Sequence, residues 1–219
     1  MQSISLTRIQ FPEISLQSRD AHKLRGYFGK LFKEHSPLLH NHYESGELRY
    51  RYPLVQYKVL NKVPTLIALN EGSDLLTSLF MKIKKLQIDG KEYDVLNKNI
   101  SNINVEAGYS NQLYEYKFQT LWMALNQSNY RIYQKADEAE KIKILQNILI
   151  GNVLSLLKGL DIHLDEDQRL MAIIKPFEKT TKFKDHNMIA FSGSFVINAL
   201  LPRGIGIGKG VSRGFGTIE

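Results

Sequence analysis

The chain has 219 residues, of which 43% are hydrophobic and 23% are charged, a balance typical of a folded globular protein rather than a disordered one. It contains no cysteine, so disulfides, thiolate metal sites and cysteine nucleophiles are excluded. Its net charge of +7 favours a polyanionic partner. The sequence has no apolar run of the roughly 20 residues that cross a bilayer, and its first residues lack the pattern of a signal peptide. We therefore expect a cytoplasmic protein without a membrane segment.

Hydrophobic periodicity predicts that strands and helices alternate along the first hundred residues. Strands are predicted where apolar residues alternate with polar ones or follow one another, at 4–11, 50–60, 65–69, 86–88 and 93–96. Helices are predicted where apolar residues recur every three or four positions, at 18–34 and 72–84. In the first of these helices the apolar face includes Leu24, Phe28 and Leu31. Asp89-Gly90 predicts a two-residue hairpin turn between the last two strands.

The second half of the chain repeats this pattern. Its predicted strands are 103–105, 114–125, 171–175, 188–200 and 215–218, and its predicted helix is 136–157. The order in the first half, β-α-β-β-α-β, is that of a ferredoxin-like unit. We therefore predict an α+β fold of two such units, an N-terminal domain over 1–100 and a C-terminal domain over 101–219.

The segment 203–216 is the most unusual in the chain, because it holds six of the fifteen glycines together with three cations. Glycine lets backbone N–H groups approach a ligand closely, and interleaved cations suit a phosphate backbone. A P-loop is excluded, because position 203 is Arg and Gly210 follows Lys209 where Ser or Thr is required. The alternatives are a loop that binds a phosphate backbone and a flexible glycine-rich tail. The candidate binding residues are Arg203, Gly204, Gly206, Gly208, Lys209, Gly210, Arg213, Gly214 and Gly216.

Two histidines, His40 and His42, follow the first predicted helix. Histidine titrates near neutral pH, so two neighbouring imidazoles can act as base and acid in one reaction. Without other clues, the more common interpretation of such a pair is two hydrogen-bonded loop residues. A metal site, completed by His35 and Glu44, is the third alternative.

The first predicted helix also has a basic outer face, made by Arg19, Lys23, Lys30 and Lys33. This face is either a solvated surface or a surface that binds nucleic acid. Three tyrosines of the next strand, Tyr50, Tyr52 and Tyr57, can stack on bases or pack in the core. We expect at least one of them to be a core residue.

Three separated segments together resemble the CRISPR repeat-processing endoribonucleases of the RAMP superfamily. They are His40-Asn41-His42, the strand Tyr-Pro-Leu-Val-Gln-Tyr-Lys over 52–58, and the glycine-rich loop over 204–216. The histidine pair resembles the subtype I-B branch in particular. The resemblance covers nearly the whole chain and implies a tandem ferredoxin-like, RRM-like fold that ends in a glycine-rich loop.

The resemblance also implies a function, the metal-independent and cofactor-independent cleavage of CRISPR repeat RNA. Attack by a 2′-OH would leave a 5′-hydroxyl and a 2′,3′-cyclic phosphate. His40 and His42 would be base and acid, and Tyr50, Lys33 or Lys30 would stabilise the phosphorane. The glycine-rich loop and the basic helix residues would hold the RNA. A non-catalytic RNA-binding subunit and a small-nucleotide-binding enzyme are the alternatives, and the sequence leaves open association with other CRISPR effector subunits or with a second copy.

Overall fold

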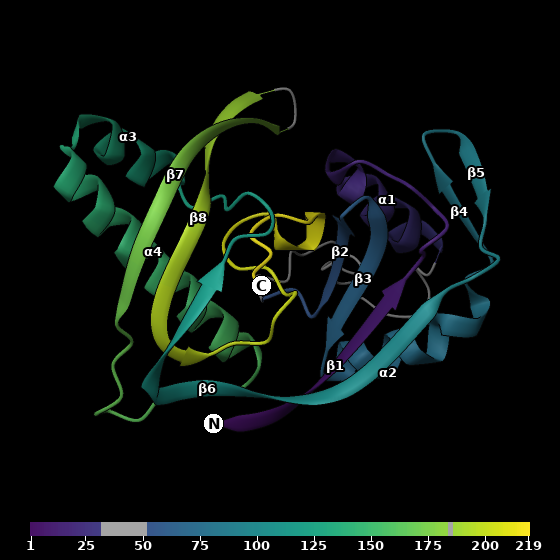
Figure 1. The fold of residues 1–219 in the computed structure, drawn as a ribbon, viewed down its shortest axis with the longest axis horizontal. Coiled ribbons are helices and arrows are strands. Elements are labelled where there is room, and N and C mark those ends of the chain that lie inside the picture. The colour runs from purple at the N-terminus through teal and green to yellow at the C-terminus, as the bar shows by residue number, and fades with distance from the viewer. Residues whose placement is uncertain (32–51, 184–185) are drawn as a thin grey trace, which may run out of the picture. The chain divides into compact units, whose positions relative to one another are not determined.

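The computed structural model describes residues 1–31, 52–183 and 186–219, and the chain divides into two compact units (Figure 1). The N-terminal unit comprises Ser3–Val105 and Val211–Gly214, and the C-terminal unit comprises Met1–Gln2, Glu106–Gly210 and Phe215–Glu219. The N-terminal unit thus includes four residues from near the C-terminus, and the C-terminal unit includes the first two residues of the chain. The domain division near residue 100 stays a prediction.

Four strands form the sheet of the N-terminal unit, in the order β2-β3-β1-β6. Their bounds are β1 (Gln2–Gln10), β2 (Val55–Leu60), β3 (Val63–Leu69) and β6 (Asn99–Lys117). β3 is antiparallel to both β1 and β2, and it follows β2 through Asn61 and Lys62, whose φ values of 50° and 69° make a tight turn. Among the described residues, one α-helix lies between β1 and β2 in the chain and another between β3 and β6, which gives the β-α-β-β-α-β order of a ferredoxin-like unit.

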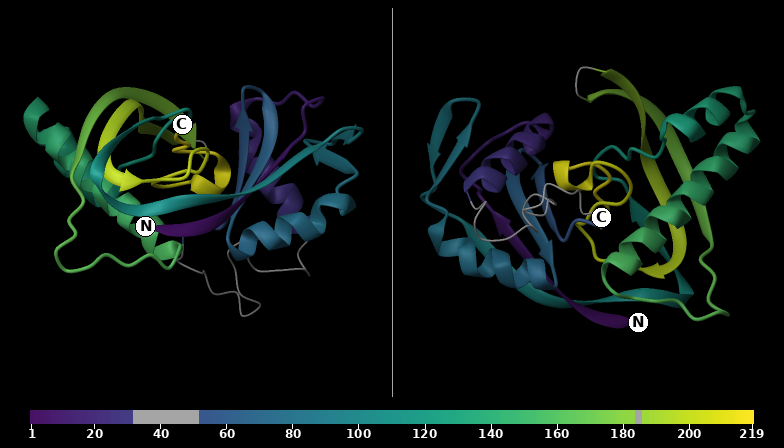
Figure 2. Two further views of the ribbon diagram at one scale, coloured as in Figure 1. Left: turned by 60° about the horizontal axis from the view of Figure 1, so that its bottom comes forward. Right: turned by 180° about the vertical axis from the view of Figure 1, so that it is seen from behind.

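The helices of this unit pack on one face of its sheet (Figure 2). They are α1 (Ala21–Leu31), which follows the short η1 (Ser18–Asp20), and α2 (Glu71–Leu79), which is followed by η3 (Phe80–Lys82). Leu24 and Phe28 of α1 are fully buried, and the Phe28 ring stacks on Tyr57 of β2 with a centroid distance of 5.8 Å. Leu31 is 45% exposed, so its assignment to the apolar face was wrong: the buried face of α1 ends one turn earlier, at Phe28.

The predicted hairpin is present as β4 (Lys85–Ile88) and β5 (Lys91–Asp94). Asp89 and Gly90 have φ values of 52° and 75°, as a two-residue turn of this type requires. The hairpin forms a separate two-stranded sheet, however, and the strand that follows β1 in the sheet of the N-terminal unit is β6. The prediction that this hairpin supplies the final strand of the first unit was therefore wrong. Leu86 and Ile88 are buried on one side of β4, whereas β5 is mostly exposed, so the hairpin is an insertion on the surface.

The C-terminal unit has a sheet of three strands in the order β6-β8-β7, with β8 antiparallel to both neighbours. Its further elements are α3 (Gln127–Lys135), α4 (Glu138–Gly159), β7 (Ala172–Phe183) and β8 (His186–Leu200). Rings of Phe118, Trp122, Phe191 and Phe195 pack together in its core. The buried side of α4 carries Leu145, Leu149, Val153 and Leu156.

Several predicted elements of this half differ from the structure. The predicted strands 103–105 and 114–125 are one strand, β6, whose pairing with β8 shifts between Tyr109 and Tyr114 and which ends at Lys117. Helix α3 was not predicted, because its sequence is largely polar. The predicted strand 215–218 is absent: Thr217 and Ile218 form isolated bridges, and the two residues before them lie in a turn. The predicted α+β class of tandem ferredoxin-like units is confirmed.

Candidate functional site

Most of the predicted catalytic residues, namely His40, His42, Tyr50 and Lys33, lie outside the described residues. The same is true of His35 and Glu44, so the metal-site alternative is not tested either. Lys30 is described: it is exposed in the last turn of α1, where a cation is favourable to the helix dipole. Within the described ranges, no three His, Asp or Glu side chains come together in a group that could hold a metal ion. None of the described helices is long and apolar enough to span a membrane.

The glycine-rich loop is part of the packed fold and not a flexible tail. Ile205 and Ile207 are fully buried. The N–H of Gly204 donates to the carbonyl of Ile218 at 2.7 Å, and the N–H of Gly216 donates to the carbonyl of Leu121 at 2.8 Å. These hydrogen bonds give the glycines a role in the fold itself, and their role toward a ligand stays a prediction.

Gly208 shows why the loop needs glycine. Its φ of +90° is unfavourable for residues with a side chain. A Cβ at this position would lie 2.6 Å from Trp122 Nε1 and 2.9 Å from Asn152 Oδ1. Trp122 Nε1–H donates to Asn152 Oδ1 of α4 at 3.0 Å, so the loop backbone packs directly on this pair.

The three cations of the loop have different surroundings. Arg203 is exposed: its guanidinium lies 5.2 Å from the ring centre of Tyr116, and its Nη2 donates to the carbonyl of Glu115 at 3.4 Å. Lys209 Nζ donates to the carbonyl of Leu125 at 3.1 Å, and burial lowers the pKa of this amine. Arg213 is half-buried in η4 (Val211–Arg213), which belongs to the N-terminal unit.

Arg25 of α1 is a cation near Arg213 that the sequence analysis missed. The segment 211–214 packs on α1 and β2, since a Cβ on Gly214 would lie 2.8 Å from the Ala21 Cβ and 3.4 Å from the Tyr57 carbonyl oxygen. Arg25 is half-buried one turn after Ala21. Burial, and then the positive charge of Arg213, lower the pKa of Arg25. No sequence pattern connects positions 25 and 213, because only the tertiary fold brings them together.

The basic face of α1 is only partly available to an external ligand. Lys23 Nζ donates to Asp20 Oδ1 at 2.7 Å and also to Asp89 of the β4–β5 turn. These two hydrogen bonds raise the pKa of Lys23 and compensate its charge. Arg19 is exposed beside Asp20; although burial alone would raise the pKa of Asp20, the hydrogen bond from Lys23 and, least of all, the charge of Arg19 lower it. RNA binding by Arg19 and Lys23 stays a prediction.

Two of the three candidate tyrosines are core residues. Tyr57 is fully buried, and Tyr52 is 9% exposed and accepts a hydrogen bond from Gln56 Nε2 at 2.8 Å. Burial raises the pKa of both phenols above its usual range. This confirms the core interpretation for Tyr52 and Tyr57, and Tyr50 lies outside the described residues.

Two ferredoxin-like units and a packed, cationic glycine-rich loop define a tandem ferredoxin-like protein. Comparison with known proteins gives a more specific result. The family model of the Cas6b N-terminal domain matches residues 2–106, and that of the Cas6b C-terminal domain matches residues 108–219. The chain therefore belongs to the Cas6b family.

Two solved structures agree with this assignment, and a curated relative is also similar. A crystal structure of Cas6b is 36% identical, covers 99% of both chains and superposes with a TM-score of 0.93. A second structure, the CRISPR RNA processing endoribonuclease Cas6b, is 33% identical and has a TM-score of 0.80. Its alignment covers 99% of this chain and 98% of the chain in that structure. An uncharacterized protein of Methanocaldococcus jannaschii is 36% identical over 141 residues, which is 64% of this chain and 95% of that protein.

Proposed function

We propose that this chain is an endoribonuclease that cleaves CRISPR repeat RNA in precursor transcripts in the cytoplasm to give mature guide RNAs. The observation that carries the proposal is the likeness, over almost its whole length, to a solved CRISPR RNA processing endoribonuclease at 33% identity. The net charge of +7 and the cations of the glycine-rich loop support a polyanionic substrate.

The proposed chemistry needs no metal. One imidazole of the pair His40 and His42 takes the proton of a 2′-OH, and that oxygen attacks the adjacent phosphorus. The other imidazole, protonated, gives its proton to the departing 5′-oxygen. The P–O5′ bond breaks, leaving a 5′-hydroxyl and a 2′,3′-cyclic phosphate. Tyr50, Lys33 or Lys30 stabilises the negative charge of the phosphorane.

In this proposal the glycine-rich loop holds the RNA backbone. Arg203, Lys209 and Arg213 contact phosphates, and Arg25 adds a fourth cation beside Arg213. Each lost phosphate contact should reduce the slope of log affinity against log salt by about 0.7 for single-stranded RNA. Lys143, which is exposed on α4, is a matched control for the loss of one charge.

The deciding experiment is incubation of the protein with a repeat RNA in EDTA. We expect one cut, which a 2′-deoxy substitution at the nucleotide before the break abolishes. Metal-dependent cleavage would refute the proposed chemistry, and binding without cleavage would identify a non-catalytic RNA-binding subunit instead.

Substitution of the histidines tests their roles. His40→Ala and His42→Ala should each slow cleavage by about 10²–10⁴-fold and change RNA affinity little. His163→Ala removes an exposed histidine of the C-terminal unit and should cleave like the wild type. Equal losses of binding and cleavage would argue against acid–base roles. Light scattering of the protein with and without RNA would show whether a second copy takes part.

A further inference from the structure

One face of the C-terminal sheet carries an exposed aromatic ring between lysines. Side chains of β7 alternate between two faces, and Lys175, Phe177 and Lys179 share one of them. Phe177 is 64% exposed. A single exposed apolar side chain is common on protein surfaces and says nothing by itself, so the surroundings of this ring decide its significance.

The helices of the unit cover the opposite face. Glu178, the next residue of β7, accepts a hydrogen bond from Tyr133 Oη of α3 at 2.9 Å. Ile174 is buried, and so is its partner Phe195 on β8. In Figure 1 both α3 and α4 lie on one side of the β7–β8 hairpin. Phe177 therefore lies on the helix-free face of the sheet.

The Phe177 ring is seated on the sheet rather than projecting freely. Residue Phe177 pairs across the strands with Ser192 of β8, and the small side chain of Ser192 leaves the ring accessible. Gly193 follows, and a Cβ there would lie 3.3 Å from Phe177 Cδ2. The ring thus rests against glycine backbone on its inner side while its outer side is open.

The charges around the ring are predominantly positive. Lys175 pairs across the sheet with Ser194 of β8, which in turn pairs with Lys117 of β6. Lys179 is one step further along β7, and all three lysines are exposed. The residues paired across the strands with Lys175, Phe177 and Lys179 share their face of the sheet, and none of them is acidic. The acidic residue that follows on this face is Glu115, which lies one pair beyond Lys117.

We infer that Phe177 stacks on an unpaired nucleobase of bound RNA, while Lys175 and Lys179 contact the flanking phosphates. An exposed ring on a helix-free sheet, with cations on either side, has the chemistry that single-stranded RNA requires: a flat apolar surface for a base and positive charge for the backbone. The inference that the ligand is RNA rests on the proposed function. The face is separate from the glycine-rich loop and from the histidine pair in sequence.

The first test is the affinity for oligouridylate and for an unpaired segment of the repeat. Phe177→Ala should weaken binding by about 5- to 100-fold, the usual effect of one lost base-stacking contact. Phe177→Leu should weaken it nearly as much, because it keeps an apolar side chain but has no aromatic face, whereas Phe177→Tyr should restore it. Ile132→Ala on α3 removes an apolar side chain of similar exposure, 61%, and should bind like the wild type.

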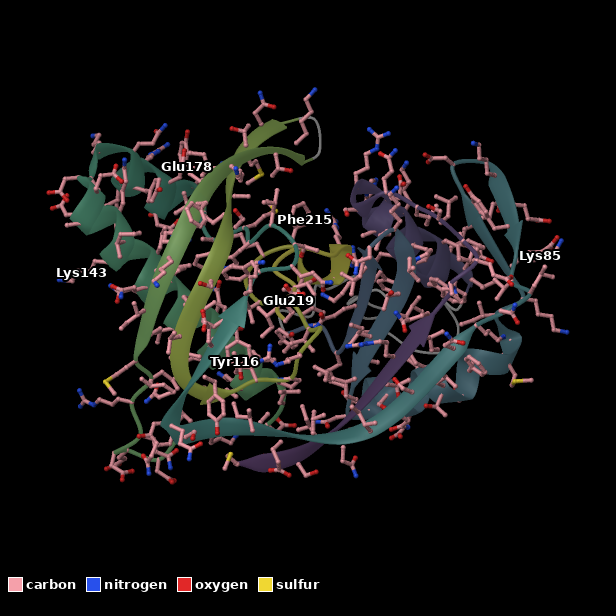
Figure 3. All side chains as sticks on the ribbon, in the orientation of Figure 1. Lys85, Tyr116, Lys143, Glu178, Phe215 and Glu219 are labelled. Carbon is pink, nitrogen blue, oxygen red and sulfur yellow. The ribbon has the colours of Figure 1, made fainter. Side chains whose placement is uncertain are left out.

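The lysines are tested through salt dependence. Lys175→Ala and Lys179→Ala should each reduce the slope of log affinity against log salt by about 0.7. Lys143→Ala makes the same change of charge on α4, which Figure 3 shows on the helix side of the unit, and should leave the slope unchanged. Equal slopes for all three variants would overturn the assignment of the lysines.

A fluorescence measurement gives a second, independent test. The chain has one tryptophan, Trp122, which is fully buried. Phe177→Trp adds an exposed indole, and we expect single-stranded oligouridylate to quench its emission, with no change in the wild type. Absence of quenching, together with unchanged affinity of Phe177→Ala, would overturn the inference.

The two proposals fail separately. If the wild type does not cut repeat RNA in EDTA, the proposed function fails whatever Phe177 does. If the wild type cuts normally and Phe177→Ala binds unpaired RNA as tightly as the wild type, only the stacking inference fails.

Discussion

At the scale of single residues, Gly208 is a position where the fold leaves no room for a side chain. Gly208→Ala should lower the free energy of unfolding by about 2–4 kcal/mol, because a positive φ is strained for alanine and the new Cβ meets the Trp122–Asn152 pair. Gly151→Ala is the matched control: a Cβ at this position in α4 has nothing within 4 Å, so it should stabilise by about 0.5–1 kcal/mol. Urea unfolding of both variants measures the difference, and equal effects would contradict the packing described for the loop.

Lys58 links stability to pH. It is fully buried on β2, and burial, followed by the nearby charge of Arg8, lowers its pKa to about 7. Between pH 7 and the ordinary pKa of 10.5, the unfolded chain binds a proton at Lys58 that the folded chain does not. The free energy of unfolding therefore rises with pH in this range, by at most about 1.4 kcal/mol per pH unit. Below pH 7 the folded protein holds a buried ammonium and this gain is absent.

Lys58→Met isolates that contribution. The stability of the wild type minus that of the variant should increase from pH 7 to pH 10, because only the wild type has the titrating amine. Urea unfolding at several pH values measures the difference. A difference that does not change with pH would show that Lys58 titrates normally.

At the scale of elements, α4 begins with reciprocal hydrogen bonds. Glu140 N–H donates to Asp137 Oδ1 at 2.8 Å, and Asp137 N–H donates to Glu140 Oε2 at 3.1 Å. Asp137→Ala should cost about 1 kcal/mol of stability, and Asp137→Asn should cost much less, because asparagine is also a good N-cap. Thermal or urea unfolding of the two variants tests this, and similar losses for both would mean that the cap is not stabilising.

Elements with strong local patterns were predictable from the sequence, and those that depend on distant contacts were not. The apolar periodicity and the acidic first turn located α4 to within two residues at each end. The Asp89-Gly90 turn was predictable because it follows local backbone rules. The separate sheet of the β4–β5 hairpin was not, since sheet membership depends on pairing with distant strands. α3 has a local signal, the Asn126–Asn129 capping box, but its few apolar residues conceal it.

The candidate site was only partly predictable for the same reason. The composition of the glycine-rich loop pointed to Arg203, Lys209 and Arg213, but it gave no indication that Ile205 and Ile207 anchor the loop in the core. Phe177 was missed because its exposure depends on the pairing of β7 with β8 and on Gly193.

At the scale of the whole molecule, two glycines close in sequence belong to different units. Gly214 lies in the N-terminal unit and Gly216 in the C-terminal unit. A Cβ on Gly214 would lie 2.8 Å from Ala21 Cβ, and one on Gly216 would lie 2.0 Å from the Ile207 carbonyl oxygen. Gly214→Ala should therefore accelerate hydrogen exchange mainly in α1 and β2, and Gly216→Ala mainly in β6 and β8. Mass spectrometry of peptide fragments resolves the two patterns, and identical patterns would contradict this division.

The assignment of Val211–Gly214 to the N-terminal unit has a consequence for how the protein is made. Residues 3–105 leave the ribosome first, yet the segment that packs on α1 and β2 is translated more than a hundred residues later. During synthesis the N-terminal unit therefore lacks the contacts of α1 and β2 with 211–214 until translation has passed residue 214.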